Sequence, residues 1–244
     1  MTVCADLHNH SCLSPCGDLY ASPSAMAHTA RRRGVDLMAL TDHNSTRNTP
    51  AFAAACRREG LMALFGTETT SREEVHILSL YPTVEAAQAW GQWVYERLPE
   101  FEHDPERFGD QVVVDVDENI LDFEARYLIP AIDATIDEIR QETLSRGGLI
   151  IPAHIDRTTN SMLSQLGFLP DLAFSALEVT TWPPVTDPRG HTLICDSDAH
   201  FIDDVAQRTF SFQAEIEFGS SQEEIFTALS AALAQGTVSL SIAQ

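Results

Sequence analysis

Short apolar runs, rich in aliphatic and branched side chains, recur along this chain and limit the folds open to it. They cover residues 3–7, 35–40, 61–65, 75–80, 149–153, 176–179 and 192–195. Continuous apolar runs of this length are typical of strands that are buried on both faces of a sheet. The sequence therefore predicts about seven buried strands.

Helix signals stand between several of these runs. Ser22-Pro23 and Thr49-Pro50 each pair an N-cap residue with a proline suited to the first helical turn, and glycines at 34 and 60 stand where those helices should end. Two further helices carry capping-box patterns and closing glycines. Their residues are Thr135 with Glu138 before Gly147, and Ser221 with Glu224 before Gly236.

Alternating strands and helices imply an α/β fold with a parallel sheet, either open and doubly wound or closed into a barrel. Seven strands favour a closed or nearly closed barrel. Residues 84–133 break the rhythm with one helix at 85–98, a polar, turn-rich section at 99–110 and a strand pair at 112–123. We interpret 84–133 as an insertion into a single domain spanning 1–244, since a second full domain is not expected at this length.

The charge of the chain bears on its partners. The formal net charge is −21, so the outer surface should repel nucleic-acid backbones and anionic membranes. The expected partner is therefore a small phosphorylated substrate, a nucleotide or metabolite, rather than a long nucleic acid or a membrane. Bound metal ions would still dominate the local field of a site for such a substrate. Oligomeric state cannot be predicted, because no heptad or exposed apolar seam stands out.

The cysteines and the apolar runs bear on the compartment. Five cysteines are an odd number without paired zinc-ribbon spacing, so a disulfide framework is not expected. The first residues, MTVCADLHNH, resemble no signal peptide, and no segment approaches the roughly 18 apolar residues of a membrane span. The expected location is the cytoplasm.

Histidines gather where the predicted strands end. Six of the nine lie within or just after an apolar run, namely His8, His10, His43, His76, His154 and His200. His28, His103 and His191 lie outside this pattern. In parallel α/β folds the loops after the strands build the active site, so such residues converge on one mouth.

Carboxylates accompany these histidines. His8 and His10 are two residues apart, which in extended backbone places both imidazoles on one face. Glu68 follows the run at 61–65, and Asp198 follows the run at 192–195. Because a structural core avoids charged groups unless they are paired, these strand ends predict a metal site rather than a set of core residues.

The segments DLHNHS, ALTDHN, GTE, EVHIL, PAHIDR and SDAH together resemble the motif series of the polymerase and histidinol phosphatase (PHP) superfamily of metal-dependent phosphoesterases. The resemblance runs from Asp6 to His200 and implies a distorted (β/α)7 barrel with two or three divalent ions at its mouth. It implies three ligand sets, with Glu68 bridging the first two. These are His8, His10, Glu68 and Asp198 for one ion, Glu68, His76 and His154 for a second, and His43 and His200 for a third. Glu68, His43 and His200 are also the candidate catalytic residues.

One segment departs from the family pattern. Relatives usually carry an acidic or histidine ligand shortly after the histidine pair, whereas this chain reads Ser14-Pro15-Cys16-Gly17-Asp18. Two residues are alternative ligands here: Cys16, as a thiolate, and Asp18, which follows the tight turn. The other interpretation of Cys16 is a purely structural thiol.

Three carboxylates and one arginine near these motifs have open roles. Asp42 and Asp6 either orient an imidazole or cap a turn. Arg157 is either a phosphate clamp, for which its guanidinium is suited, or a member of a surface salt bridge. Glu178 ends an apolar run and is interpreted as structural, since the resemblance gives it no metal role.

An aromatic group lies in the predicted helix of the insertion, formed by Trp90, Trp93 and Tyr95. We expect it to pack that helix on the barrel. The alternative is that one aromatic stacks on a nucleobase, as a lid would.

The predicted function is hydrolysis of a phosphate ester of a small metabolite or nucleotide by metal-activated water. The alternatives are a histidinol-phosphate phosphatase and a catalytically silent metal-binding regulatory module. Mixed imidazole and carboxylate ligands suit zinc, manganese and iron alike, so the metal is left open.

Overall fold

The structure is a computed structural model that describes residues 1–217 and 219–242. Its strands are β1 Thr2–Asp6, β2 Leu37–Leu40, β3 Met62–Thr70, β4 His76–Tyr81, β5 Val112–Val114, β6 Ile120–Phe123, β7 Leu149–Pro152, β8 Leu177–Glu178, β9 Leu193–Ile194, β10 Thr209–Gln213 and β11 Val238–Ser241. Its α-helices are α1 Pro23–Arg32, α2 Thr49–Glu59, α3 Val84–Tyr95, α4 Pro105–Phe108, α5 Ile136–Ser145, α6 Met162–Leu166 and α7 Gln222–Gln235, with a 3-10 helix at Ile202–Asp204.

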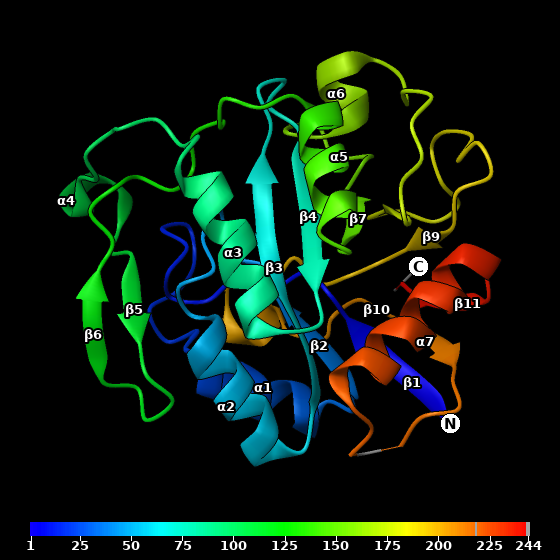
Figure 1. Ribbon diagram of the computed structural model, residues 1–244, viewed down its shortest axis with the longest axis horizontal. Helices are drawn as coiled ribbons and strands as arrows, with labels where there is room; N and C mark the ends of the chain where they lie inside the picture. Colours follow the sequence, from blue (N-terminus) through cyan, green and yellow to red (C-terminus); the bar gives the residue numbers. More distant parts are fainter. Residues whose placement is uncertain (218, 243–244) are drawn as a thin grey trace.

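The main sheet is curled and has the strand order β11-β10-β1-β2-β3-β4-β7 (Figure 1). The short parallel pair β8 and β9 continues the curl. The N–H of Ser175, which precedes β8, donates to the carbonyl of Ile150 in β7, and Asn9 forms a parallel bridge with Ala199 after β9. These contacts lead from β7 back toward β1. The predicted α/β class and distorted barrel with an insertion are confirmed.

The sheet is not parallel throughout, which corrects one expectation. β1, β2 and β3 are parallel, whereas β4 is antiparallel to both β3 and β7. The connection from β3 to β4 is the tight turn closed by the hydrogen bond from Ser71 N–H to the Val75 carbonyl. A parallel return would need a crossover of a dozen or more residues, so a link this short forces the antiparallel pairing.

Two strands, β10 and β11, were not predicted. Their burial alternates between buried or partly buried and more exposed positions, because they form the edge of the sheet beyond β1. Edge strands with polar residues on one side give no continuous apolar run, which was the signal used to find the others.

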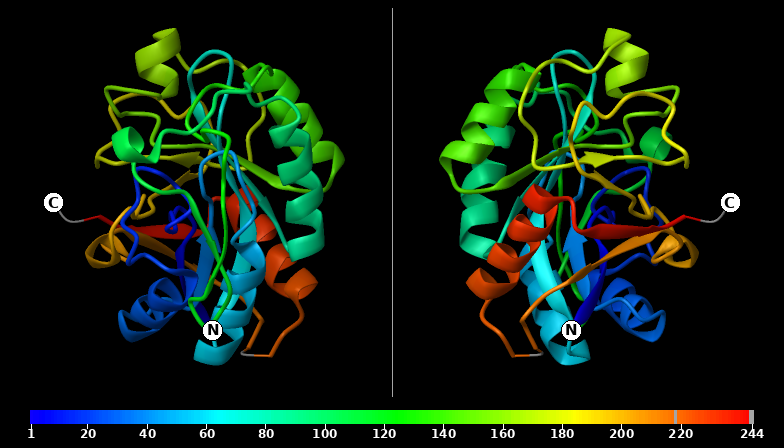
Figure 2. Two further views of the ribbon diagram at one scale, coloured as in Figure 1. Left: turned by 90° about the vertical axis from the view of Figure 1, so that its left-hand side faces the viewer. Right: turned by 90° about the vertical axis from the view of Figure 1, so that its right-hand side faces the viewer.

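Two layers of apolar side chains hold the sheet. On β2, Leu37 and Ala39 belong to one cluster, while Met38 and Leu40 belong to the other. The first cluster contains the buried face of α7, and the second contains residues of α1, α2, α3 and α5. α7 therefore covers one face of the sheet, and α1, α2, α3 and α5 cover the other; Figure 2 shows α3 and α5 along one flank of the molecule. A strand buried on both faces explains the uninterrupted apolar runs of the sequence.

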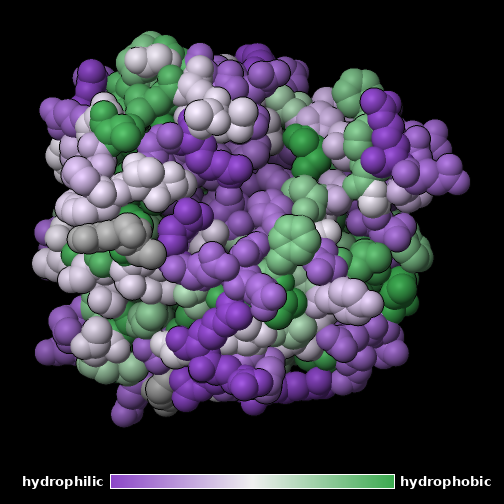
Figure 3. Space-filling model, turned by 180° about the vertical axis from the view of Figure 1, so that it is seen from behind, coloured by the Kyte–Doolittle hydropathy of each residue, from purple (hydrophilic) through white to green (hydrophobic). Residues whose placement is uncertain are grey.

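Of residues 84–133, α4 and the antiparallel pair β5–β6 lie at one edge of the molecule, on the left in Figure 1, whereas α3 packs on β3. The insertion is tied to the body. The Val112 N–H donates to the Cys12 carbonyl at 3.0 Å, and the Asn44 side chain donates to the Leu128 carbonyl at 2.7 Å. The face seen from behind is largely hydrophilic, with apolar patches between (Figure 3). Within the described part of the chain, no helix is long and apolar enough to cross a membrane.

Candidate metal centre

The side chains from six strand ends lie together in one buried cluster. His8 and His10 follow β1, His43 follows β2, Glu68 lies near the end of β3, and His76 begins β4. The remaining members are His154 after β7 and Asp198 with His200 after β9. His28, His103 and His191 do not join the three metal-compatible groups found among residues 1–217 and 219–242.

The first group consists of His8, His10, Glu68 and Asp198. His8 Nε2 lies 3.1 Å from His10 Nε2, 3.3 Å from Glu68 Oε1 and 3.3 Å from Asp198 Oδ1. His10 Nε2 lies 3.2 Å from Glu68 Oε2 and 3.4 Å from Asp198 Oδ1. Ligands about 2.1 Å from a tetrahedral ion lie about 3.4 Å from one another, so these spacings fit the edges of one coordination shell.

The second group consists of His43, Glu68 and His76. His154, which the resemblance implied for this set in place of His43, lies beside the group, so Glu68 faces three other histidines. Its Oε1 lies 2.8 Å from His76 Nδ1 and 3.0 Å from His154 Nε2, and its Oε2 lies 3.1 Å from His43 Nδ1. A single carboxylate thus contacts imidazoles from five positions while being only 1% exposed. This placement suits a carboxylate that bridges two ions.

The third group consists of His10, His43 and His200. The His10 ring lies 4.4 Å from the His43 ring and 4.2 Å from the His200 ring, measured between centroids. The structure therefore adds His10 to the pair that the resemblance implied for a third ion. Ligand roles for all these residues stay predictions, but their juxtaposition is a property of the fold.

Several buried polar atoms of the cluster have no hydrogen-bond partner among residues 1–217 and 219–242. They include Glu68 Oε2, Asp198 Oδ1 and His43 Nδ1. Buried polar groups are nearly always hydrogen-bonded, because leaving one unpaired costs about 1–3 kcal/mol. Lone pairs that point at a common space without pairing fit a cation-binding site, and oxygen with imidazole nitrogen is a donor set for divalent metals.

The ionisation of the cluster reflects the same geometry. Burial lowers the pKa of His8, but the carboxylates of Glu178, Glu68 and Asp198 outweigh it and place that pKa well above its usual value. Burial also lowers the pKa of His10, but the contacts of its ring with the carboxylates of Asp198 and Glu68 outweigh that effect and raise the pKa to about 9. Despite burial, the surrounding histidines hold the pKa of Glu68 well below its usual value.

For His43 and His200 at the mouth of the cluster, burial outweighs the effect of the nearby carboxylates on the pKa. Burial holds the pKa of His43 well below its usual value, and burial with the charge of His10 lowers the pKa of His200 to about 4. Both imidazoles are therefore neutral at neutral pH and free to act as ligands.

Metal affinity should rise with pH from about 7 to about 9. In the metal-free protein His10 is protonated below its pKa of about 9, so a cation must displace that proton to bind. Affinity should gain about tenfold per pH unit for each proton displaced, and level off above the pKa. Mn²⁺ titrations across this range test the prediction. Equal affinity at both ends would show that His10 is already neutral in the metal-free protein.

The two alternative ligands in the segment 14–18 stay outside the metal-compatible groups found among the described residues. Cys16 is exposed at the surface, and desolvation by its neighbours, followed by the carboxylate of Glu68, raises the pKa of its thiol, so in the metal-free protein it is a thiol. Asp18 caps its own turn by accepting the Tyr20 N–H at 3.0 Å, and its N–H donates to the His200 carbonyl at 2.8 Å.

Asp42 acts on the cluster through serines rather than directly. Its Oδ1 accepts the Ser14 hydroxyl at 2.8 Å and the Ser11 N–H at 2.7 Å. Ser14 Oγ in turn lies 3.1 Å from His10 Nδ1 and accepts the His43 N–H at 3.1 Å. Asp42 therefore fixes the Ser14 hydroxyl between the His10 imidazole and the backbone N–H of His43. Ser14 was not singled out from the sequence, because one serine in a turn carries no distinctive signal.

The Asp6 carboxylate accepts backbone N–H groups rather than orienting an imidazole. Its two oxygens accept the N–H groups of Ser197 and Ala206, both at 3.0 Å. It thereby anchors the loop that carries Asp198.

Arg157 lies at the rim, with its side chain 44% exposed, and its Nη1 forms an ion pair with Asp198 Oδ2. The guanidinium therefore holds one oxygen of Asp198 while the other faces the histidines. Both predicted roles, an ion pair and a phosphate contact, are compatible with this position.

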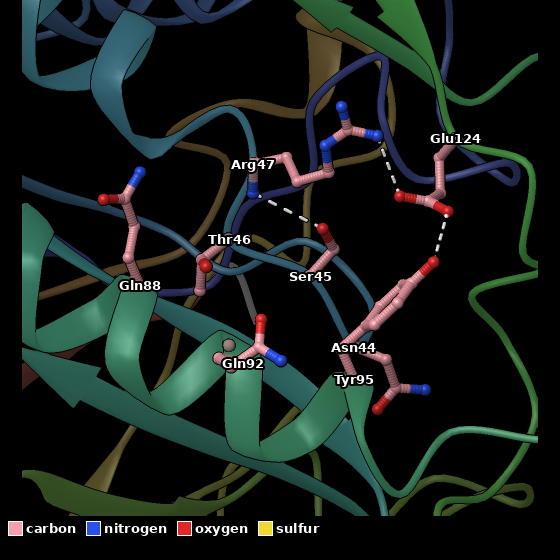
Figure 4. Close-up of a pocket in the computed structure, with 9 residues that line it drawn as sticks. Asn44, Ser45, Thr46, Arg47, Gln88, Gln92, Tyr95 and Glu124 are labelled. Atoms are coloured by element: carbon pink, nitrogen blue, oxygen red, sulfur yellow. Dashed lines mark hydrogen bonds and ion pairs between the residues drawn. The ribbon is translucent and has the colours of Figure 1, made fainter.

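A separate pocket of about 400 Å³ lies between α3, the loop after β2 and the insertion (Figure 4). Arg47 Nη1 lies 2.9 Å from Glu124 Oε2, and the Tyr95 hydroxyl donates to Glu124 Oε1 at 3.1 Å. No predicted metal ligand lines it.

Trp90 is fully buried and donates to Thr67 Oγ1 at 2.7 Å, so it packs α3 on the sheet, as expected for the aromatic group.

Comparison with known proteins supports the same fold. Residues 6–143 match the PHP domain family. A lesion-specific endonuclease, Endonuclease Q of Pyrococcus furiosus, superposes with a TM-score of 0.67 at 18% identity, over 98% of this chain and 58% of the endonuclease. A two-domain protein of Bacteroides vulgatus ATCC 8482, containing a predicted PHP-like metal-dependent phosphoesterase, superposes with a TM-score of 0.58 at 15% identity, over 99% of this chain and 65% of that protein.

An error-prone DNA polymerase of Nocardia farcinica (strain IFM 10152) is 35% identical over 100 residues. That match covers 41% of this chain and 9% of the polymerase. The chain thus spans less than two thirds of these relatives.

The expected partners need correction. The prediction of a small substrate and of no long nucleic acid was wrong, because the fold is shared with Endonuclease Q in complex with a 27-mer duplex carrying an abasic lesion, at a TM-score of 0.66. Net charge describes the average surface, whereas cations and a few side chains determine the field at a site.

The family match covers more than half of the chain and agrees with the fold and with the motifs from Asp6 onward. The chain belongs to the PHP domain family.

Proposed function

We propose that this protein is a metal-dependent phosphoesterase that hydrolyses phosphodiester bonds of nucleic acid, with residues 1–244 forming one PHP domain and 84–133 an insertion. The observation that carries the proposal is the environment of Glu68, a buried carboxylate with imidazoles from five positions around it. Such a carboxylate suits two adjacent cations, which is the arrangement that two-metal phosphoester hydrolysis uses.

The proposed cofactors are two or three divalent ions, zinc, manganese or iron. When bound, such ions neutralise a phosphate and lower the pKa of water. The side chains of this chain would fix their positions. Glu68 would bridge the first two sites, His8, His10 and Asp198 would complete the first, and His76 and His154 the second. His43 and His200, neutral at neutral pH, would bind at the mouth and orient the phosphate group beside them.

Nucleic acid as substrate class is supported by two comparisons. Endonuclease Q shares the fold and is known in complex with a damaged duplex, and the partial relative is a DNA polymerase. The acidic outer surface should make binding depend on contacts near the metal centre rather than on long-range attraction. Arg157 is the basic residue placed for such a contact, because it is exposed at the rim and paired with Asp198.

Replacing Arg157 by Ala should lower kcat/KM for a phosphodiester by about tenfold to a hundredfold, because it removes a charged contact to phosphate and frees one oxygen of Asp198. Arg157→Lys should recover only part of the loss, since an ammonium lacks the guanidinium fork. Steady-state kinetics of both variants test this. Unchanged kinetics in Arg157→Ala would leave the residue as a surface ion pair only.

The function is tested by reconstituting the protein with Mn²⁺, Zn²⁺ or Fe²⁺ and assaying four substrates, each with a chelated control. These are bis(p-nitrophenyl) phosphate, p-nitrophenyl phosphate, an intact DNA duplex and a duplex with one abasic site. Metal-dependent cleavage of the diester and of at least one DNA is expected. Cleavage of the monoester alone would contradict the proposed substrate class. Metal binding without any hydrolysis would contradict the proposed enzymatic activity and favour a catalytically silent metal-binding module.

A further inference from the structure

Glu178 ends β8 and is fully buried beside the metal centre. Its Oε2 accepts a hydrogen bond from His8 Nδ1 at 2.9 Å. From the geometry we infer that Glu178 is a positioning residue of the metal centre, which fixes His8 and His154 through a single carboxylate oxygen. This inference rests on the proposed metal centre and corrects the sequence-based interpretation of Glu178 as merely structural.

The first step concerns the tautomer of His8. A carboxylate can only accept, so the proton of the neutral imidazole lies on Nδ1 and the lone pair lies on Nε2. That Nε2 is the atom that lies 3.3 Å from both Glu68 Oε1 and Asp198 Oδ1. A carboxylate that holds the far nitrogen of a ligand imidazole sets its orientation and raises its basicity, at a typical worth of tenfold to a hundredfold in metal affinity.

The second step concerns His154. The same Oε2 accepts the backbone N–H of His154 at 3.0 Å. His154 has a φ of +30°, a backbone region that side chains larger than glycine rarely occupy. Strained residues persist where surrounding contacts hold them. Glu178 therefore stabilises the backbone that directs the His154 imidazole to Glu68, with Nε2 at 3.0 Å from Oε1.

The third step concerns charge. Glu178 Oε1 has no hydrogen-bond partner among the described residues, and no arginine pairs with this carboxylate in that part of the chain. A buried carboxylate without compensation is costly, and the partner it does have is the His8 imidazole. The negative charge of Glu178 thus lies at Nδ1 of His8, on the side of the ring away from the cation-binding Nε2, and acts on that nitrogen through the imidazole. A carboxylate needed only to fill the core would be replaceable by a neutral isostere without effect on metal binding.

The experiment measures Zn²⁺ affinity by competition with a chromophoric chelator in Glu178→Gln and in Asp156→Asn. Glu178→Gln keeps the shape and a hydrogen-bond acceptor but removes the charge. Asp156→Asn is the matched control, because Asp156 lies near the same loop and, within the described part of the chain, accepts hydrogen bonds only from Thr180 and Thr181. The melting temperature of each metal-free variant checks folding.

We expect Glu178→Gln to lose about tenfold or more in Zn²⁺ affinity while Asp156→Asn stays within about threefold of wild type. Equal affinities in Glu178→Gln and wild type would overturn the inference. If both variants lose affinity equally, the effect is general charge loss and the inference is also overturned.

A second measurement does not depend on any variant folding. In Zn²⁺-loaded wild-type protein with ¹⁵N-labelled histidine, the His8 resonances should show a proton on Nδ1, and a proton on Nε2 would overturn the inference. These outcomes are separable from the proposed function. If Glu178→Gln loses Zn²⁺ affinity as expected but wild-type protein hydrolyses none of the substrates, the proposed enzymatic function is contradicted and the role of Glu178 stands.

Discussion

Glu68→Gln is expected to lower metal-dependent hydrolysis by at least about a thousandfold. The amide removes the charge and one of the two oxygens able to bind a cation, while five histidines around it remain. The ions would then be held by imidazoles and Asp198 alone, with nothing to bridge the first two sites. Assays with bis(p-nitrophenyl) phosphate and metal analysis of the purified variant test this.

Glu74→Gln serves as the control for that experiment, because Glu74 is exposed in the turn after β3. Circular dichroism should show the same fold for both variants and for wild type. Glu68→Gln with near wild-type turnover and metal content would mean that hydrolysis occurs elsewhere or without a bridged pair of ions.

Gly66→Ala is expected to have the largest effect on stability. A Cβ at Gly66 would lie 1.8 Å from the Ser79 carbonyl oxygen and 3.2 Å from the Leu80 Cα, both of them backbone atoms of β4. Neither can move without separating β3 from β4. We expect a loss of at least about 3 kcal/mol in the free energy of unfolding, measured by urea denaturation.

Gly147→Ala is the comparison for this prediction. Nothing lies within 4 Å of a Cβ at Gly147, and its φ of +75° makes alanine strained without a clash. Its cost should be about 1 kcal/mol. Similar losses in the two variants would mean that β3 and β4 separate easily at Gly66. Because Glu68 lies two residues further along β3, Gly66→Ala should also weaken metal binding.

Much of this arrangement could be predicted from the sequence, because two signals coincide. Apolar runs such as 149–153 locate strands, and the polar residue that follows, His154, must then lie at the strand end. The same logic placed Glu68 and His200 near one another without any contact information. The capping boxes at Thr135 and Ser221 formed as predicted, since their contacts are local.

The features that could not be predicted depend on the geometry of one turn and on contacts between distant segments. The direction of β4 is decided by a tight turn at 71–75 rather than by the composition of the strand. Glu178 was interpreted as structural because the resemblance gives it no metal role, and its partner His8 is 170 residues away in the sequence. The signal was present, however: a carboxylate ending a fully buried strand requires a partner. The partner prediction was wrong because net charge averages over a surface and says little about one site.

The central claim, that distant strand ends form one cation-binding basin around Glu68, is tested most directly by anomalous diffraction from crystals grown with Mn²⁺ or Zn²⁺. We expect anomalous peaks within bonding distance of Glu68, one of them shared with His8, His10 and Asp198 and another with His76 and His154. Crystals that contain the ions in solution but show no peak at Glu68, or peaks only at surface carboxylates, would contradict the account.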